Sequence, residues 1–351
     1  MRFYNLVVTD PAGLVWKPTD DGLGFTKSAG GSTFTSQDPQ GNNLPGSLNI
    51  EFDFAQYTFD QYQGTALIHV WGVGLGMISQ AANLNGSDFK LYAGMMQGLP
   101  LATAAYQNGQ QGLILQGRIF QAFGNWQGVN QTLDLLCYPG ASNTGQDIGF
   151  NWPQGVTLTG ALQQTMQQAF PTYTVNVNVS DALQPKSAQV GHYSSLAAFA
   201  SYLKAHTQSL GAGTYGATYN GVTITITNKT ITITDGQGPT APKTITLNFQ
   251  DLIGQPTWIS GNQLSFKTVL RADITVGTQV KFPVGLQNPY ALTSAEAAAA
   301  SPGLAPASSK SAFTGTFFVQ EAHYFANFRQ ADADSWATAF VCAAIAGTAT
   351  Q

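Results

Sequence analysis

The stretch Ser47-Leu48-Asn49-Ile50-Glu51-Phe52-Asp53-Phe54 indicates the fold class of this chain. Its even-numbered residues are all apolar and its odd-numbered residues are all polar, which is the period-two pattern of a strand with one buried face. Further strands are expected over residues 65–73, 89–93, 112–123 and 131–138, separated by turns that carry Gly or Asn. Many short strands at this spacing predict a barrel or a sandwich.

The period changes after about residue 143. Apolar residues recur every fourth position from Leu158 to Phe170, after a possible N-cap at Thr157 and before Pro171, which predicts an amphipathic helix. A second helix is expected over residues 194–210, with Gly211 ending it. This middle stretch therefore reads as a small α+β unit.

A β-hairpin is predicted next, because residues 222–227 and 230–234 alternate Ile with Thr and are joined by Asn228-Lys229. Strands then return at 244–249, 264–276, 279–283, 313–325 and 336–344. Residues 284–312 are a low-complexity stretch expected to form a flexible connection. The chain is thus predicted to be mainly β with an α+β insert, and no repeat with a period of 20 to 50 residues is visible.

The composition favours a subunit of an assembly. The chain has 351 residues, a formal net charge of -4, and only 9% charged residues, against roughly a quarter in an ordinary soluble domain. A polar surface with few ions can pack against copies of itself without desolvating many charges. The absence of a Lys/Arg cluster argues against specific nucleic-acid binding, and no apolar segment approaches the roughly 20 residues needed to span a bilayer.

Residues that could carry chemistry are sparse, and we assign no catalytic, cofactor-binding or metal-binding residue. The four histidines have no metal-like spacing, and those in predicted strands read as hydrogen-bonded structural residues. Both cysteines continue the alternating series of apolar residues in predicted strands, so we expect them to be small buried apolar residues. The Gly72-Val73-Gly74-Leu75-Gly76 stretch lacks the rest of a nucleotide-binding motif and reads as a glycine-rich turn. The histidines are His69, His192, His206 and His323, with His206 expected on the solvated side of its helix, and the cysteines are Cys137 and Cys342.

Three stretches resemble baseplate hub proteins of contractile-tailed bacteriophages, which are related to the hub part of type VI secretion spikes. Residues 112–123 resemble that family's first-barrel strand, with an apolar run, a glycine turn and a returning strand. Residues 251–259, leading into the Arg-x-Asp-Ile pattern of residues 269–283, resemble a hairpin of the second barrel. Residues 315–323 followed by 334–338 resemble the final hairpin.

The resemblance implies two tail-tube-like β-barrel domains plus a small α+β domain. These would be a first barrel at 1–140, an α+β middle domain with the hairpin at 141–243, and a second barrel at 244–351. Three subunits would form a ring of six quasi-equivalent barrels that adapts a six-fold tail tube to a three-fold central spike. Because the chain ends at Gln351, soon after the second barrel, the spike is expected to be a separate chain.

The implied partners are two sister copies in a homotrimer, the tail tube protein, the central spike protein, and baseplate wedge and tape-measure proteins. DNA would pass through the lumen without specific binding, because a mildly acidic wall repels its backbone. The implied location is the tail baseplate of the virion, after assembly in the host cytoplasm. No enzymatic activity and no cofactor are implied.

Two other functions stay open at this stage. A tail-associated peptidoglycan hydrolase would need a carboxyl pair, for which Glu51 and Glu321 are the candidates among only three glutamates, the third being Glu296. A glycan-binding module would need exposed aromatic residues, for which Trp126, Trp152 and Trp258 are the candidates. The simpler expectation is that these tryptophans pack in the core. For Glu51 and Glu321, it is that they face outward from their strands.

Overall fold

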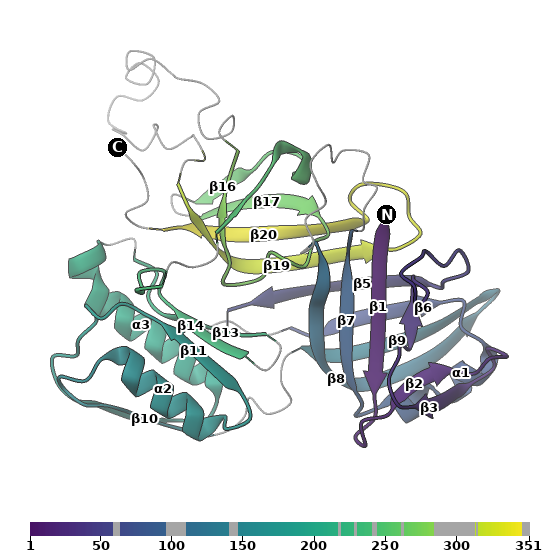
Figure 1. The fold of residues 1–351 in the computed structure, drawn as a ribbon, viewed down its shortest axis with the longest axis horizontal. Coiled ribbons are helices and arrows are strands. Elements are labelled where there is room, and N and C mark those ends of the chain that lie inside the picture. The colour runs from purple at the N-terminus through teal and green to yellow at the C-terminus, as the bar shows by residue number, and fades with distance from the viewer. Residues whose placement is uncertain are drawn as a thin grey trace, which may run out of the picture.

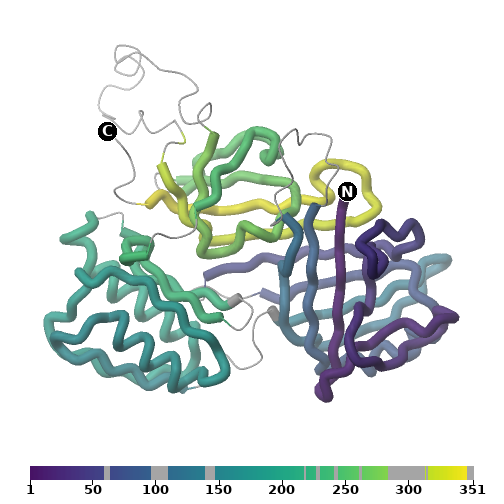
Figure 2. The backbone as a smooth tube through the Cα atoms, viewed as in Figure 1, coloured from purple at the N-terminus to yellow at the C-terminus, as the bar shows by residue number. Residues whose placement is uncertain are grey.

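The computed structural model describes residues 1–58, 64–95, 110–139, 147–216, 219–227, 230–240, 244–260, 263–283, 313 and 315–345. The predicted mainly β fold with an α+β insert is confirmed (Figure 1). Figure 2 shows three lobes, with the insert at the left, the N-terminal strands at the right and the C-terminal strands above. The predicted connection at 284–312 lies outside the described residues.

The N-terminal lobe, here called the first β region, is a curled sheet with a short helix. Its core lies between β1 and β7 on one side and β5, β6 and β9 on the other (Figure 1). Its elements are β1 (Arg2–Thr9), β2 (Val15–Pro18), β3 (Phe25–Ser28), β4 (Phe34–Thr35), β5 (Asn49–Tyr57), β6 (Ala66–Trp71), α1 (Leu75–Ser79), β7 (Asp88–Met95), β8 (Gln111–Gln127) and β9 (Asn130–Pro139).

The C-terminal lobe, here called the second β region, is smaller and continues the same sheet. The strand order is β16-β17-β20-β19-β5-β6-β9-β8-β7-β1-β2-β3, so that β19 pairs with β5 and joins the two regions. One apolar core runs through both. The strands are β15 (Thr244–Thr246), β16 (Thr257–Ser260), β17 (Gln263–Val269), β18 (Gln279–Lys281), β19 (Phe317–Asn327) and β20 (Trp336–Ala344).

The alternating stretch that opened the sequence analysis forms β5, with Ile50, Phe52 and Phe54 buried as predicted. The predicted glycine turn inside residues 112–123 is wrong, because β8 runs through it as one strand with a bulge between Ile119 and Gln121. Gly117 is needed there for close approach and not for turning, since a Cβ on it would overlap the Tyr138 carbonyl oxygen.

The α+β insert has a core of its own. Thr157 caps α2 as predicted, its hydroxyl accepting from the Gly160 N–H, and the predicted hairpin is confirmed as β13 and β14. The predicted end of the second helix at Gly211 is wrong, because the missing Cβ there makes room for the Tyr219 ring and the helix continues. The elements are β10 (Ile148–Trp152), α2 (Leu158–Ala169), β11 (Thr174–Asn178), β12 (Gln189–Tyr193), α3 (Leu196–Tyr215), β13 (Thr223–Thr227) and β14 (Thr230–Thr234).

The Arg-x-Asp-Ile pattern of the second β region forms a turn after β17 and not a strand of a hairpin. Arg271 is buried there and donates from Nε and Nη2 to Asp273 at 2.6 and 2.5 Å. Its Nη1 also lies 3.3 Å from Asp251. Burial alone would lower the pKa of Arg271, but the two carboxylates outweigh it and raise that pKa. The turn is therefore held by a buried ion cluster.

Candidate interaction surface

The two β regions contain the same arrangement of five strands. In the first, the order is β5-β6-β9-β8-β7, and in the second it is β16-β17-β20-β19-β18. In each set, the first two strands form one hairpin, the next two form another, and the fifth pairs antiparallel with the last hairpin strand. We call these two sets the first and second modules.

A bulge at matching places aligns the two modules residue by residue. In the first, Ile119 pairs with Cys137 and the ladder then skips one residue. In the second, Val319 pairs with Cys342 and the ladder skips one residue at the same step. The two cysteines therefore occupy equivalent positions. Both are free and buried, as the sequence predicted, and burial raises the pKa of each thiol.

The two modules meet edge to edge inside one chain. β19 first pairs with β18 and then, from Glu321 to Asn327, pairs antiparallel with β5. Phe54 and Tyr324 stack across this joint on the core side, with ring centroids 4.9 Å apart. The joint shows how the fourth strand of one module, β19, pairs with the first strand of the other, β5.

The two outer ends of the eight-strand series β16-β17-β20-β19-β5-β6-β9-β8 have open edges. Residues 121–127 of β8 pair with β9 on one side. No described strand pairs with their other side, where the Asn85 side chain accepts the Ala122 N–H at 2.7 Å and Gly124 lies against Ile78 of α1. β16 pairs only with β17 among the described strands. An open strand edge offers unpaired backbone groups to another chain.

One face of this series is not covered by the core. It carries a row of side chains in which Glu51 accepts from the Trp71 indole at 2.9 Å and His69 Nδ1 lies 2.7 Å from Asp134. His323 Nε2 lies 2.5 Å from Asp53 in the neighbouring row. The prediction that His69 and His323 are hydrogen-bonded structural residues is confirmed.

A hollow of about 430 Å³ opens on this face between β5 and the β19–β20 turn. Glu51, Asp53, Asp332 and Asp334 line it, together with His69. Asp334 is paired with Lys267 at 3.0 Å. The hollow is wide and shallow, and its lining is more acidic than basic.

The two glutamates considered for hydrolysis lie on neighbouring strands but not side by side. Glu51 pairs with Asn327 and Glu321 pairs with Tyr57, at opposite ends of the β5–β19 ladder. At about 3.4 Å per residue the two positions are roughly 20 Å apart, whereas the carboxyl pair of a glycosidase is about 5 to 9.5 Å apart. This geometry does not form a hydrolytic pair, and Glu296 lies outside the described residues.

The two histidines of the insert differ from each other. His192 lies 3.9 Å from Asp147 at the surface. The prediction that His206 faces solvent is wrong, because its ring stacks on Tyr202 and meets Trp152 edge-on, and burial lowers its pKa. No three His, Cys, Asp or Glu residues gather in a metal-binding geometry in the described part of the chain.

The glycine-rich stretch after β6 turns the chain at residues 72–74, as predicted, and its last two residues begin α1. Gly72 has a φ of +82°, which favours glycine. Gly74 and Gly76 lie against the backbone of residues 22–24, where a Cβ would overlap carbonyl oxygens. That helix has only five residues. These glycines therefore serve backbone packing.

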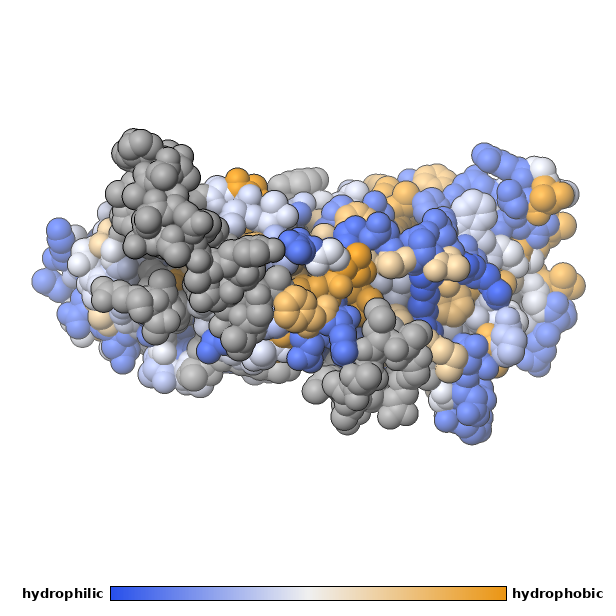
Figure 3. Space-filling model, turned by 90° about the horizontal axis from the view of Figure 1, so that it is seen from above, coloured by the Kyte–Doolittle hydropathy of each residue, from blue (hydrophilic) through white to orange (hydrophobic). Residues whose placement is uncertain are grey.

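The three tryptophans proposed for glycan binding do not form a common platform. Trp152 is fully buried and its indole donates to the Val156 carbonyl at 2.8 Å. Trp258 is half-buried and stacks on Phe313. Only Trp126, at the tip of the β8–β9 hairpin, is exposed, at 62%. Apolar residues on the face drawn in Figure 3 likewise lie in small patches among hydrophilic ones.

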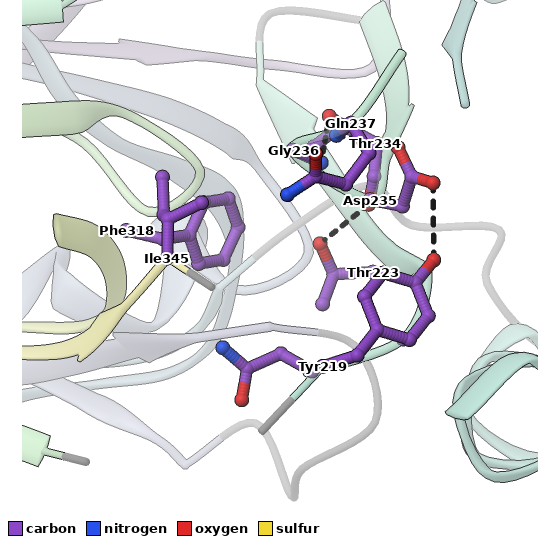
Figure 4. Close-up of a pocket in the computed structure, with 10 residues that line it drawn as sticks. Tyr219, Thr223, Thr234, Asp235, Gly236, Gln237, Phe318 and Ile345 are labelled. Carbon is purple, nitrogen blue, oxygen red and sulfur yellow. Dashed lines mark hydrogen bonds between the residues drawn. The ribbon is translucent and has the colours of Figure 1, made fainter. Parts of the chain in front are cut away.

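A second pocket lies at the seam between the insert and the second β region (Figure 4). Asp235 Oδ2 accepts from the Tyr219 hydroxyl and from the Ser180 N–H, both at 3.0 Å. Burial first, and then the charge of Asp235, raise the pKa of Tyr219. Phe318 and Ile345 close the other side, and the space of about 20 Å³ is large enough for about one water. The pocket is a packed seam that connects the two lobes.

No helix in the described residues is both long enough and apolar enough to cross a membrane. Neither a protein-family model nor a curated protein sequence matches the chain.

Among solved structures, the chain is similar to the E. coli c3393 protein, a type VI secretion component with structural similarity to the T4 bacteriophage tail proteins gp27 and gp5. The TM-score is 0.47 at 8% identity, over 87% of this chain and 76% of that one. A tail protein from Neisseria meningitidis MC58 gives 0.44 at 9% identity, over 85% and 97%. The 43 kDa tail protein of prophage MuSo2 from Shewanella oneidensis gives 0.43 at 8% identity, over 97% and 96%.

Proposed function

We propose that this chain is a structural subunit of a phage tail baseplate hub, of which three copies form a closed ring. The single observation that supports this is the pair of modules with one strand order, joined edge to edge in a continuous sheet. A closed ring would cover the strand edges at the two outer ends of this pair of modules. Three chains of two modules each give six quasi-equivalent positions, which suits an adaptor between a six-fold tube and a three-fold spike.

The proposed ring has the uncovered sheet face as its lumen. The opposite face of β5, β6 and β9 is packed under β1 and β7, so those two strands would lie on the outside of the ring. The acids around the hollow, among them Glu51, Asp53 and Asp332, would give the lumen a mildly acidic wall. DNA could then pass without being held, because like charges repel.

The proposed partners are two sister copies, the tail tube protein, the central spike protein, and baseplate wedge and tape-measure proteins. The proposed location is the virion tail, with assembly in the host cytoplasm. We propose domain limits of 1–140, 141–243 and 244–351, with the β19–β5 ladder crossing between the first and last of these. The role is structural and not enzymatic, which agrees with the wide separation of Glu51 and Glu321 along that ladder.

Native mass spectrometry combined with negative-stain imaging of the full chain tests the proposal. We expect a species of three subunits and ring-shaped particles with a central hole. A monomer at all concentrations, alone or mixed with tail tube and spike proteins, would contradict it.

A further inference from the structure

The α+β insert is joined to the two β regions differently from the way those regions are joined to each other. The β regions share one sheet and one apolar core. Among the described strands, those of the insert form two sheets of their own, and the insert has a separate core. Lobes with separate cores generally move relative to one another unless a large apolar interface fixes them. The contacts at the seam therefore decide whether the insert is fixed.

The insert meets the second β region with the threonine face of its β13–β14 hairpin. Thr223, Thr225 and Thr234 on this face are buried, whereas the isoleucines of the hairpin belong to the core of the insert. Thr225 lies against Gly277 of the second β region, where an added Cβ would be 3.5 Å from the Thr225 hydroxyl oxygen. Short side chains against a glycine give the seam little apolar contact area.

The hydroxyl groups of this face are bonded inside the insert. Thr223 donates to the Thr234 carbonyl at 3.1 Å, and Thr225 donates to the Thr232 carbonyl at 3.5 Å. Figure 4 shows the first of these bonds on the side of the pocket that the insert provides. Because these buried hydroxyls already have partners, they need none in the second β region. They therefore do not hold the insert in one position.

The contacts recorded across the seam include a long hydrogen bond and one aromatic ring. The Asn220 side-chain amide donates to the Ala344 carbonyl at 3.5 Å, near the outer limit for a hydrogen bond. Phe318 of β19 stands across the pocket from the insert, beside Ile345 (Figure 4). Phe318 is buried but belongs to neither core. Its ring gives the insert an apolar surface to pack on, with a water-sized space beside it.

The segment by which the chain leaves the insert is bonded to the insert as far as Thr240. Asp235 accepts from the Ser180 N–H at 3.0 Å. The Asn178 side chain donates to the Thr240 carbonyl at 2.6 Å and accepts from the Thr240 N–H at 3.0 Å. The first strand of the second β region, β15, begins at Thr244. The insert and this exit segment therefore form one rigid unit.

We propose that the insert is a mobile lobe that shifts as a rigid body over Phe318, while the two β regions stay fixed to each other. The β regions are held by the β19–β5 ladder and by the stacked Phe54 and Tyr324 rings. Movement at the seam exchanges one set of small apolar contacts for another and breaks no strand ladder. It lets the exposed surface of the insert adjust to a partner without changing the sheet. This inference does not depend on the proposed ring.

Distances between pairs of spin labels, measured by pulsed electron paramagnetic resonance on the full-length chain, test the proposal. Labels on Gln167→Cys and Lys90→Cys span the seam. Labels on Lys90→Cys and Thr257→Cys span the β19–β5 joint, and labels on Gln167→Cys and Val190→Cys both lie in the insert. All four sites are exposed. Labelled chain is mixed with an excess of unlabelled chain before assembly, so that each distance is measured within one copy.

The distance distribution across the seam is expected to be at least about twofold broader than the other two. Cys137 and Cys342 are buried and take up no label. A distribution across the seam as narrow as both controls would overturn the mobile lobe. That result would leave the proposed function intact, because its test is the presence of a three-subunit ring.

A substitution at the seam gives a second test. Phe318→Ala removes the ring on which the insert packs and should broaden the distribution across the seam further, while the distribution across the β19–β5 joint stays unchanged. The matched control is Phe120→Ala in β8, whose ring is 53% exposed in the first β region, and it should change neither distribution. If Phe318→Ala also changes neither, movement over Phe318 is overturned.

Discussion

The first and second modules share a strand order but are supported in different ways. In the first, β1 and the module's fifth strand β7 pack over β5, β6 and β9, and apolar side chains fill the space between them. In the second, the fifth strand β18 and its partner β15 have only three residues each, and the buried cluster of Arg271, Asp251 and Asp273 holds the β17–β18 turn. What the modules share is the sheet, the bulge and the buried thiol. The common features are therefore those that shape the continuous sheet, and the differences lie in what covers it.

The largest expected effect concerns the ion cluster, which has no counterpart in the shared features. Asp273→Asn removes the main partner of a buried Arg271 and leaves its charge poorly compensated. We expect a loss of about 3–5 kcal/mol in the free energy of unfolding, measured by urea denaturation. The matched control is Asp88→Asn, which breaks an exposed pair with Arg118 and should cost no more than about 1 kcal/mol. Equal losses would show that the cluster does not support the second module.

A smaller loss of stability is expected at a position where β8 of the first module differs from β19 of the second. Gly117 in β8 aligns with Phe317 in β19, and only the first position lies against a carbonyl oxygen, that of Tyr138. Gly117→Ala should destabilise the chain by about 1–3 kcal/mol, because the β8–β9 ladder must shift. Gly149→Ala in β10, where a Cβ meets open space, is the control and should change stability little in the same denaturation experiment.

The smallest effect tests the equivalence of the two modules. Cys137→Ala and Cys342→Ala each remove one sulfur from a dry, equivalent site. Each should lower the free energy of unfolding by about 1 kcal/mol, and the two losses should agree within a few tenths. In the native wild type neither thiol should react with a thiol reagent at neutral pH, because burial raises both pKa values. Rapid labelling of one cysteine but not the other would contradict the equivalence of the two sites.

The local sequence predicted secondary structure correctly where the conformation of a segment depends on its own few residues. The alternation of residues 47–54 predicted β5, Thr157 predicted the start of α2, and the Ile/Thr repeats predicted the β13–β14 hairpin. Residues 336–344 were predicted as a strand and form β20 with the same limits. The predictions of a turn at Gly117 and of a helix end at Gly211 were wrong, because each glycine permits a close tertiary contact and neither ends an element.

By itself, therefore, the sequence determined many of the strands, both helices of the insert, which faces of those elements are apolar, and that few residues are suited to chemistry. Periodicity and capping act within a few residues, so they can be read along the chain. Only the tertiary structure decided that β19 pairs with β5, that Cys137 matches Cys342, and which edges are left open. Partners such as β5 and β19 lie more than two hundred residues apart, and their choice depends on the register and packing of the whole sheet, which no local pattern encodes.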